Sequence, residues 1–317
     1  MLRILRLPFH FLTALVFLYI SFSPGFGQGC SDAGFCTMGA MKPNQHFPGK
    51  VNLKLKSIEF GQYIGVTKFK DVILSYMVDA NFAINPKTAI QFKLPYTFVS
   101  GFLANTHGLG DISISATRNV FSRENFQINF TAGGKIPTND ANKKSHGRPL
   151  PMYYQTSLGT YDLVFGLSFI TKKWLFATGY QASLNPIDND FIWGDWKGTE
   201  FQERVLEYPV SSMIRRGTDI MFRIERNFRS SRFNSYIGLL PIYRLNKDRV
   251  QNPQTKKTVE VKGSDGLALT VLSGFGYRFS VKSSFKLLVG VAVVQRDVNP
   301  DGLSREFVNT VSYEYKF

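Results

Sequence analysis

From about Val51 to Phe317 the chain is a series of runs in which apolar and polar residues alternate. In the last run, 307–317, the odd positions are mostly apolar or aromatic and the even positions mostly polar. Strict alternation with a period of two is typical of a β-strand whose two faces meet different surroundings. Runs of roughly ten to fourteen residues have the length of strands that cross an outer membrane within a barrel.

The alternation predicts twelve strands. They lie at about 51–63, 72–84, 88–98, 111–121, 126–136, 161–170, 174–184, 218–227, 233–245, 267–279, 285–295 and 307–317. The connections after the even-numbered strands are short, and those after the odd-numbered strands are mostly long, the first being the shortest of that set. Outer-membrane barrels have short turns at one end and long loops at the other. A soluble sandwich also alternates, but it has no reason to place every long connection on one side. The sequence therefore predicts an all-β fold, a transmembrane antiparallel up-and-down β-barrel of about 12 strands.

One face of these strands is almost free of charge, and the other carries charged and polar residues. Because a charge at the bilayer midplane costs about 2–4 kcal/mol, the uncharged face is predicted to contact lipid. Its exceptions, Arg118 and Arg226, lie near strand ends, where long side chains can reach water. The charged residues predicted to line the lumen are Asp79, Lys93, Asp111, Asp162, Arg223, Glu225, Arg278 and Lys286.

Aromatic residues near strand ends form a second pattern. Tyr63, Trp174, Tyr277 and Tyr313 are predicted to form aromatic girdles at the membrane interfaces. The ordinary preference of aromatic residues for strands explains each of them equally well.

The first twenty residues have Arg3 and Arg6 ahead of an apolar core, and small and turn-forming residues follow. This arrangement predicts a secretory signal peptide at 1–28. Lipoprotein processing at Cys30 is the alternative, although the residues before it match a lipid-attachment site poorly. No later apolar stretch has the eighteen or so residues of a membrane helix.

Residues 29–50 form a segment before the barrel, which spans 51–317, and this segment is expected either to remain periplasmic or to act as a plug. It holds both cysteines of the chain, Cys30 and Cys36. Because export places them in an oxidising compartment, a disulfide is expected. A metal site would need more ligands than the nearby His46, and a redox site would need a closer spacing. No metal and no cofactor is predicted.

The formal net charge is +15. Export excludes nucleic acid as the partner of this charge. The remaining acidic partners are lipopolysaccharide phosphates, anionic lipid headgroups, or an anionic solute drawn toward a pore. A solvated basic loop surface explains most of the residues without any partner. The candidates for contact with lipopolysaccharide or anions are Lys143, Lys144, Arg148, Arg249, Lys256 and Lys257.

Some outer-membrane barrels are enzymes, and each needs a base near a nucleophile or a pair of acids. Beyond the signal peptide, the histidines are His46, His107 and His146. Ser145 precedes His146 directly, and neighbours in sequence rarely form a nucleophile–base pair. The chain is therefore predicted not to be an enzyme, with no catalytic residue.

Two further features carry resemblances. The final Tyr313, Tyr315 and Phe317 resemble the carboxy-terminal signal that the bacterial barrel-assembly machinery reads. Gln28, at the predicted cleavage site, resembles that position in exported proteins of Bacteroidetes-type bacteria.

Three segments together carry a family resemblance: 108–115 (GLGDISIS), 133–140 (GGKIPTND) and 157–166 (SLGTYDLVFG). The pattern is similar to the outer-membrane transporter family labelled "MetA-pathway of phenol degradation", which is related in architecture to long-chain fatty-acid transporters. The chain departs from the family at Asn139 and Tyr161, where the family usually or often has Gly. The resemblance implies passage of small, often hydrophobic molecules and names no substrate. Asp111 and Asp162 begin inward faces here, where bonding of loop backbone is favoured over substrate binding.

The predicted function is an outer-membrane channel or passive transporter for a small-molecule solute that the sequence does not name. A barrel of twelve strands has a wider lumen than the filled eight-strand type, which favours passage. The alternative is a non-conducting structural or adhesin-type barrel. Both place the protein in the cell outer membrane, in contact with its lipid.

Overall fold

The computed structural model describes Met38, residues 54–252 and residues 254–317. Among these residues, strands predominate and helices are limited to single short turns. None of the described helices is long and apolar enough to cross a membrane.

Three predictions concern the amino-terminal region. The signal peptide at 1–28 and the disulfide between Cys30 and Cys36 lie outside the described residues. Of the segment 29–50, only Met38 is described, and it is almost completely buried.

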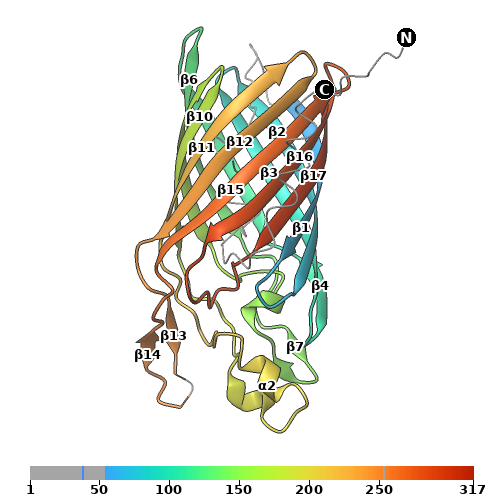
Figure 1. Cartoon of the computed structure of the whole chain (residues 1–317). Coiled ribbons are helices and arrows are strands. Elements are labelled where there is room, and N and C mark those ends of the chain that lie inside the picture. The colour runs from blue at the N-terminus through green and yellow to red at the C-terminus, as the bar shows by residue number, and fades with distance from the viewer. Residues whose placement is uncertain (1–37, 39–53, 253) are drawn as a thin grey trace, which may run out of the picture.

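Twelve antiparallel strands close into a barrel, as predicted (Figure 1). The barrel strands are β1 (Lys54–Val66), β2 (Val72–Asn85), β3 (Thr88–Ser100), β5 (Ile112–Ser122), β6 (Phe126–Ile136), β9 (Asp162–Thr171), β10 (Trp174–Ser183), β11 (Asp219–Ser230), β12 (Phe233–Arg244), β15 (Gly266–Arg278), β16 (Ser283–Val294) and β17 (Phe307–Lys316). Neighbours in the barrel are neighbours in sequence, and β1 pairs with β17 to complete the ring. Every described strand of the barrel wall is thus hydrogen-bonded on both sides.

The connections differ sharply between the two ends of the barrel. At one end, called here the short-turn end, the turns between barrel strands have two to four residues. At the other, the long-loop end, lie all the smaller elements (Figure 1). These are β4 (Asn105–Leu109), β7 (Lys144–Ser145), β8 (Arg148–Pro149), η3 (Met152–Tyr154), η4 (Trp193–Trp196), α2 (Gln202–Val205), β13 (Arg249–Gln251) and β14 (Thr258–Glu260).

Strand β4 lies in a segment, 99–110, that the alternation assigns to a loop. It pairs with the far half of β3, from Tyr96 to Ser100, whereas the near half of β3, from Thr88 to Lys93, pairs with β5. With five residues, β4 is too short to show a period of two. The wall therefore extends beyond the barrel at this corner, as a hairpin of β3 and β4.

The outward face of the strands is apolar. Phe92, Leu94, Phe222 and Leu239 are all substantially exposed, while their neighbours in sequence are more buried. A continuous apolar surface of this kind is unfavourable in water and is what a lipid bilayer requires.

The inward face has two different walls. Strands β2, β3, β5 and β6 bury polar and charged side chains, among them Ser115, Thr117 and Asn129. Strands β9 to β12 and β15 bury an apolar cluster that includes Val164, Leu175, Met221, Leu240 and Leu272. Met38 packs in this apolar cluster, so this residue of the segment before β1 lies inside the barrel.

Two inward tyrosines lie over glycines. A Cβ atom at Gly274 would stand 2.1 Å from the ring of Tyr236, its partner across the β12–β15 pair. A Cβ at Gly65 would likewise stand 2.5 Å from the hydroxyl of Tyr63. Glycine is required at both positions because the ring occupies the space of a side chain.

The position of Tyr63 corrects one prediction. Tyr63 was expected in an aromatic girdle, but it is only 4% exposed and belongs to a cluster inside the barrel. Odd-numbered residues of β1 point inward in this stretch, as the burial of Tyr63 beside exposed Phe60 shows. Trp174 and Tyr313 are exposed on the outer surface.

The two faces can be tested by charge substitution. Leu239, in the middle of β12, is 45% exposed, and Leu206, after α2, is 50% exposed. Leu239→Arg is expected to destabilise the barrel in lipid by about 2–4 kcal/mol, because the guanidinium would lie in hydrocarbon. Leu206→Arg, the matched control in a loop, should change stability little. Urea unfolding in lipid vesicles measures both, and equal tolerance would contradict the assignment of the faces.

Candidate functional site

The charged residues predicted to line the lumen occupy different environments. Asp79, Lys93, Asp111, Asp162, Arg223 and Glu225 are buried. Lys286 is partly buried and forms ion pairs of 2.9 Å with Glu59 and with Glu314. Arg278 lies at the short-turn end, exposed, and donates a hydrogen bond to the carbonyl of Ser231.

Strand register joins several of these residues into one row. Glu59 stands opposite Asp79, which stands opposite Lys93. Lys93 stands opposite Ser113, Ser113 opposite Lys135, and Lys135 opposite Asp162. The row crosses β1, β2, β3, β5, β6 and β9, and it ends at Asp162, the first residue of β9 at the long-loop end. Charges of both signs therefore follow the polar wall toward this end.

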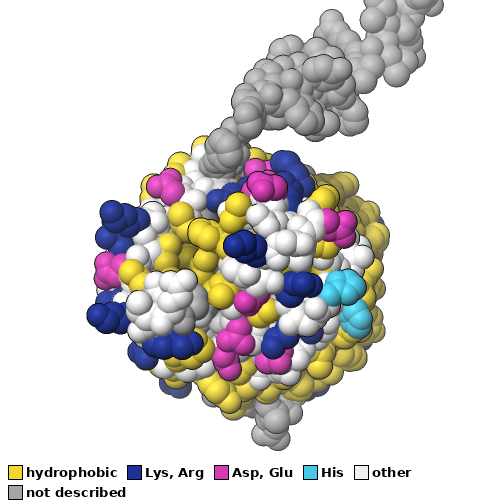
Figure 2. Space-filling view, turned by 90° about the horizontal axis from the view of Figure 1, so that it is seen from below, with side chains coloured by type: hydrophobic (Ala, Val, Ile, Leu, Met, Phe, Trp, Pro, Cys, Tyr) yellow, Lys and Arg dark blue, Asp and Glu magenta, His cyan; other side chains and the backbone are white. Residues whose placement is uncertain are grey.

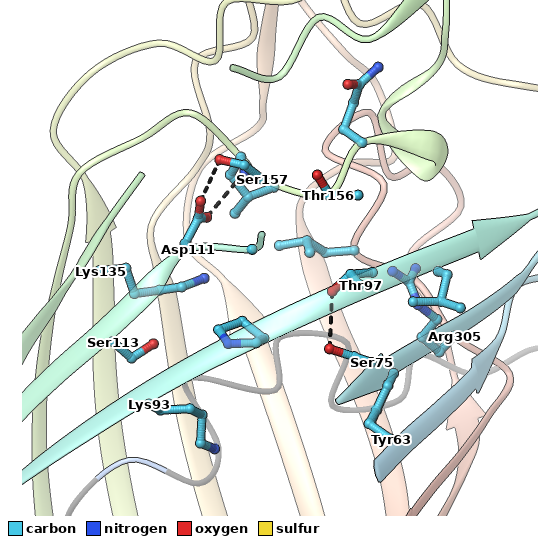
Figure 3. Close-up of a pocket in the computed structure, with 16 residues that line it drawn as sticks. Tyr63, Ser75, Lys93, Thr97, Asp111, Ser113, Lys135, Thr156, Ser157 and Arg305 are labelled. Carbon is cyan, nitrogen blue, oxygen red and sulfur yellow. Dashed lines mark hydrogen bonds between the residues drawn. The ribbon is translucent and has the colours of Figure 1, made fainter. Parts of the chain in front are cut away.

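The three segments that carry the family resemblance meet at the long-loop end. The carboxylate of Asp111 accepts a hydrogen bond from the hydroxyl of Ser157 and another from the backbone N–H of Leu158 (Figure 3). Thr138 donates a hydrogen bond to the carbonyl of Gly110, and Ser157 also contacts the carbonyl of Asn139 at 2.8 Å. Asp111 thus holds loop backbone, and the three segments form one structural unit.

A network of three arginines and four aspartates, called here the arginine–aspartate network, adjoins this unit through Asp162, which belongs to the third segment. Arg244 binds Asp219, Asp248 and Asp301 at 2.7–2.8 Å. Arg216 contacts Asp162 at 2.9 Å and Asp301 at 3.3 Å. The remaining member, Arg296, contacts Asp219 at 3.4 Å. Such buried charges are stable only when every one has partners, so the network fixes the loops that supply them.

Residues 295–306, the connection from β16 to β17, are called here the mouth loop. Asp301 of this loop joins the arginine–aspartate network. Gly302, at a φ of +69°, lies so close to the backbone of Met152 in η3 that a Cβ would stand 2.6 Å from it. Leu303 and Arg305 lie beside the segment 155–158. The mouth loop therefore makes contact on both sides of the long-loop end.

The environment of Asp301 determines its protonation. Burial by itself would raise the pKa of this carboxyl, but Arg244, Arg216 and Arg296 hold the pKa well below its usual range. Burial raises the pKa of Asp248, against the opposing charge of Arg244. Of these two buried carboxylates of the network, Asp301 is therefore the one whose ionised form is favoured.

A second buried polar group lies in the loop between β1 and β2. The carboxylate of Asp71 accepts hydrogen bonds from the hydroxyls of Tyr154 and Tyr208, at 2.7 and 2.9 Å. Burial raises the pKa of Asp71, and these hydroxyls oppose the rise. Because Tyr154 and Tyr208 come from two other loops, Asp71 ties three loops together.

A cavity of about 110 Å³ lies between the converged segments and the mouth loop (Figure 3). Its lining includes Lys93, Lys135, Thr156, Ser157 and Arg305. Of these residues, only Lys93 is among those that the alternation predicts to line the lumen. Lys135 has the same parity as Gln127, Asn129 and Thr131 and could have been found from it. Thr156 and Arg305 lie in loops, where no periodic signal marks them.

No group of three or more His, Cys, Asp or Glu residues could hold a metal ion among the described residues. His107 is exposed on β4 and hydrogen-bonds the hydroxyl of Tyr96, and His146 is exposed in the turn between β7 and β8.

No protein-family model and no curated protein matches this chain. Among solved structures, it is similar to the COG4313 outer membrane channel from Pseudomonas putida F1. The TM-score is 0.57 at 12% identity, over 87% of this chain and 99% of that one. At this identity the likeness shows the fold.

Two more distant structures share the barrel. The NanC porin has a TM-score of 0.46 at 9% identity, over 83% of this chain and 100% of that one. Outer membrane phospholipase A from Escherichia coli has a TM-score of 0.39 at 7% identity, over 84% and 98%. Neither is similar enough to carry an argument about function. The closed barrel, its apolar outer face and the outer-membrane channel that shares its fold indicate an outer-membrane protein.

The network predicts a specific dependence on pH. Asp301→Asn should lower the free energy of unfolding by about 3–5 kcal/mol at pH 7, because it leaves buried arginines short of a partner. The pKa of Asp301 is lower in the folded state than in the unfolded one. Its contribution is therefore complete above the unfolded value of about 3.9 and is lost as the pH falls through the lower folded value.

Urea unfolding in lipid vesicles at pH 7, 5 and 3 tests this expectation. Asp188→Asn, in an exposed loop position, is the control and should have no effect at any pH. The loss for Asp301→Asn should be smaller at pH 3 than at pH 7, because part of the contribution has gone once the pH is below the unfolded value, and an equal loss at both would contradict the assignment.

Proposed function

We propose that this protein is a channel or passive transporter of the outer membrane for small molecules. The observation that carries the proposal is a closed barrel of twelve strands whose interior combines buried polar residues on β2, β3, β5 and β6 with an apolar cluster on β9 to β12 and β15, beside which β11 buries the Arg223–Glu225 ion pair. A barrel that serves only as a scaffold has no need of such an interior. A solute with polar and apolar parts would find matching surfaces along the whole path.

The lining residues have defined parts in this proposal. Asp79, Lys93, Arg223, Glu225 and Lys286 would lie along the path from the long-loop end to the short-turn end. Asp111 and Asp162 would shape its entrance by holding loops. The hydrogen bonds that Asp111 accepts from the backbone N–H of Leu158 and Asp162 accepts from Arg216 support this role. The mouth loop would set the width of the entrance, because it is anchored on one side by Asp301.

The finer parts of the proposal rest on sequence patterns. The resemblance to the "MetA-pathway of phenol degradation" family favours small, often hydrophobic solutes. The convergence of its three motif segments at one end of the barrel supports a common role for them. Gln28 at the predicted cleavage site supports a source in Bacteroidetes-type bacteria, and Tyr313, Tyr315 and Phe317 support insertion by the barrel-assembly machinery.

Contact with lipopolysaccharide is proposed for the long-loop end. Figure 2 shows this end with Lys and Arg side chains distributed around it among Asp and Glu. Lys144, Lys256 and Lys257 are exposed there. Arg249 is also exposed and lies 3.7 Å from Glu260, so it is partly neutralised. The contact would be with phosphates at the edge of the barrel and would not involve the lumen.

A non-conducting structural or adhesin-type barrel is the second candidate. The arginine–aspartate network favours it, because seven buried charged groups at one end make a rigid closure. The two candidates differ in whether the mouth loop can leave its place. An enzymatic function is not proposed: the exposed His107 hydrogen-bonds the hydroxyl of Tyr96, and the exposed His146 follows Ser145 in a turn.

Single-channel conductance in planar bilayers tests the proposal. The full protein should conduct, and replacing residues 297–304 with Gly-Ser-Gly should raise the conductance by about twofold or more, because conductance depends on the narrowest part of a pore. The control makes the same replacement at residues 254–257, in the turn between β13 and β14, and should leave the conductance unchanged. A folded protein that is silent both with and without the mouth loop would support the scaffold.

A further inference from the structure

The cavity beneath the converged segments has two polar atoms that lack a partner. They are the Nε of Arg305 and the hydroxyl oxygen of Thr156, which are buried without any hydrogen bond. Both residues line the cavity, and they are only 7% and 8% exposed. A buried donor without a partner is destabilising, so native proteins rarely leave one without a reason.

The other hydrogen bonds of Arg305 are made by a different nitrogen of its guanidinium. Its Nη1 donates to the carbonyls of Gly302 and Ser304 in the mouth loop. These bonds fix the guanidinium in place while its Nε remains available. A fixed guanidinium with an available N–H is well suited to bind an anionic oxygen.

The charge of the lining has the same sign as this donor. Lys93, Lys135 and Arg305 contribute three positive charges to the lining, and Asp111 contributes the one carboxylate. Asp111 is already bonded to Ser157 and Leu158. The lining of the cavity is therefore positive overall.

Two more carboxylates lie near the lysines but do not line the cavity. Asp79 stands opposite Lys93 in the strand register, and it accepts a hydrogen bond from Gln91. Asp162 stands opposite Lys135 and is bound by Arg216. Both carboxylates thus interact with other donors as well, and a third carboxylate, Asp71, interacts electrostatically with Arg305.

The remaining lining is mixed, with polar groups from Tyr63, Ser75, Thr97, Ser113 and Gln155 beside an apolar part. Ile73, Pro95, Leu158 and Leu303 form the apolar part. Its volume of about 110 Å³ is somewhat below the roughly 150 Å³ of an engineered apolar cavity that binds benzene. The cavity therefore has room for a polar headgroup and a short apolar chain and no room for a large solute.

We propose that this cavity is a binding site for a compact carboxylate with a short aliphatic chain. The carboxylate oxygens accept hydrogen bonds from Arg305 Nε and from the hydroxyl of Thr156, beside Lys93 and Lys135. The chain lies against Ile73 and Leu303. The inference rests on the proposed function only in that the anion enters and leaves through the lumen or the long-loop end. It names short-chain carboxylates as the class of solute that binds there.

The site can be tested by calorimetric titration of the full protein in lipid nanodiscs. The probes are propionate and butyrate, with propionamide and butyramide as neutral controls of the same shape, and inorganic phosphate. The carboxylates should bind at least about tenfold more tightly than the amides, the difference expected for a hydrogen bond to a charged group. Equal binding of acids and amides, or tighter binding of phosphate, would overturn the assignment.

A single substitution separates binding from folding. Thr156→Val removes a hydroxyl that has no partner in the protein, so the barrel should fold with unchanged stability. Butyrate affinity should fall about tenfold, and Thr156→Ser should restore it. Thr255→Val, in an exposed loop, is the matched control. If Thr156→Val binds butyrate like the original protein, the cavity holds water only and the proposal fails.

Binding of butyrate tests the site, and conduction of ions tests the channel, so the two measurements separate the two proposals. A protein that conducts ions but does not bind butyrate retains the proposed function and loses this site. A protein that binds butyrate in the Thr156-dependent way but never conducts retains the site and loses the channel.

Discussion

The backbone cannot leave a hydrogen bond unmade in hydrocarbon, and most of this structure follows from that constraint. A sheet meets it only when its two edges join, as β1 and β17 do here from Ser57 to Val66. Closure separates two environments. Each strand must then have an apolar outer face, while its inner face can be polar. The two faces together give an average composition, so composition alone does not identify a membrane protein.

Inside the ring, the cost of buried charge determines where the loops lie. Arg216, Arg244 and Arg296 could not remain buried without carboxylates, and the carboxylates come from strands and loops alike. The long-loop end is therefore organised from within, by electrostatics. The apolar wall is organised by packing, with Met38 among Val164, Leu175 and Met221.

The wall of the barrel was predictable because every residue of a strand obeys the same period. The alternation predicts all twelve barrel strands to within three residues at each end, since the loss of the pattern sets each boundary. The prediction for Tyr63 is wrong. Its place near a strand end suggests the membrane interface, but its odd position in β1 puts its side chain on the inward face.

The mouth was much less predictable. Asp111 was expected to hold loop backbone, and it does, because a carboxylate beginning an inward face has few other partners. Thr156, Arg305 and Asp301 acquire their surroundings from segments far away in sequence. Nothing in a loop's own residues reveals which distant side chains will surround it, so the cavity could only be seen in three dimensions.

The pairing of β1 with β17 also bears on how the molecule is made. Ten residues of the first barrel strand have their partners in the last one, including Ser57 with Lys316 and Val66 with Phe307. Contacts between residues so far apart in sequence form late, because the loop they close is almost the whole chain. Until β17 is in place, β1 is an open edge able to pair with any other strand. The chain therefore depends on being shielded from other strands throughout its synthesis and export, and the last hydrogen bonds to form are the ones that end this exposure.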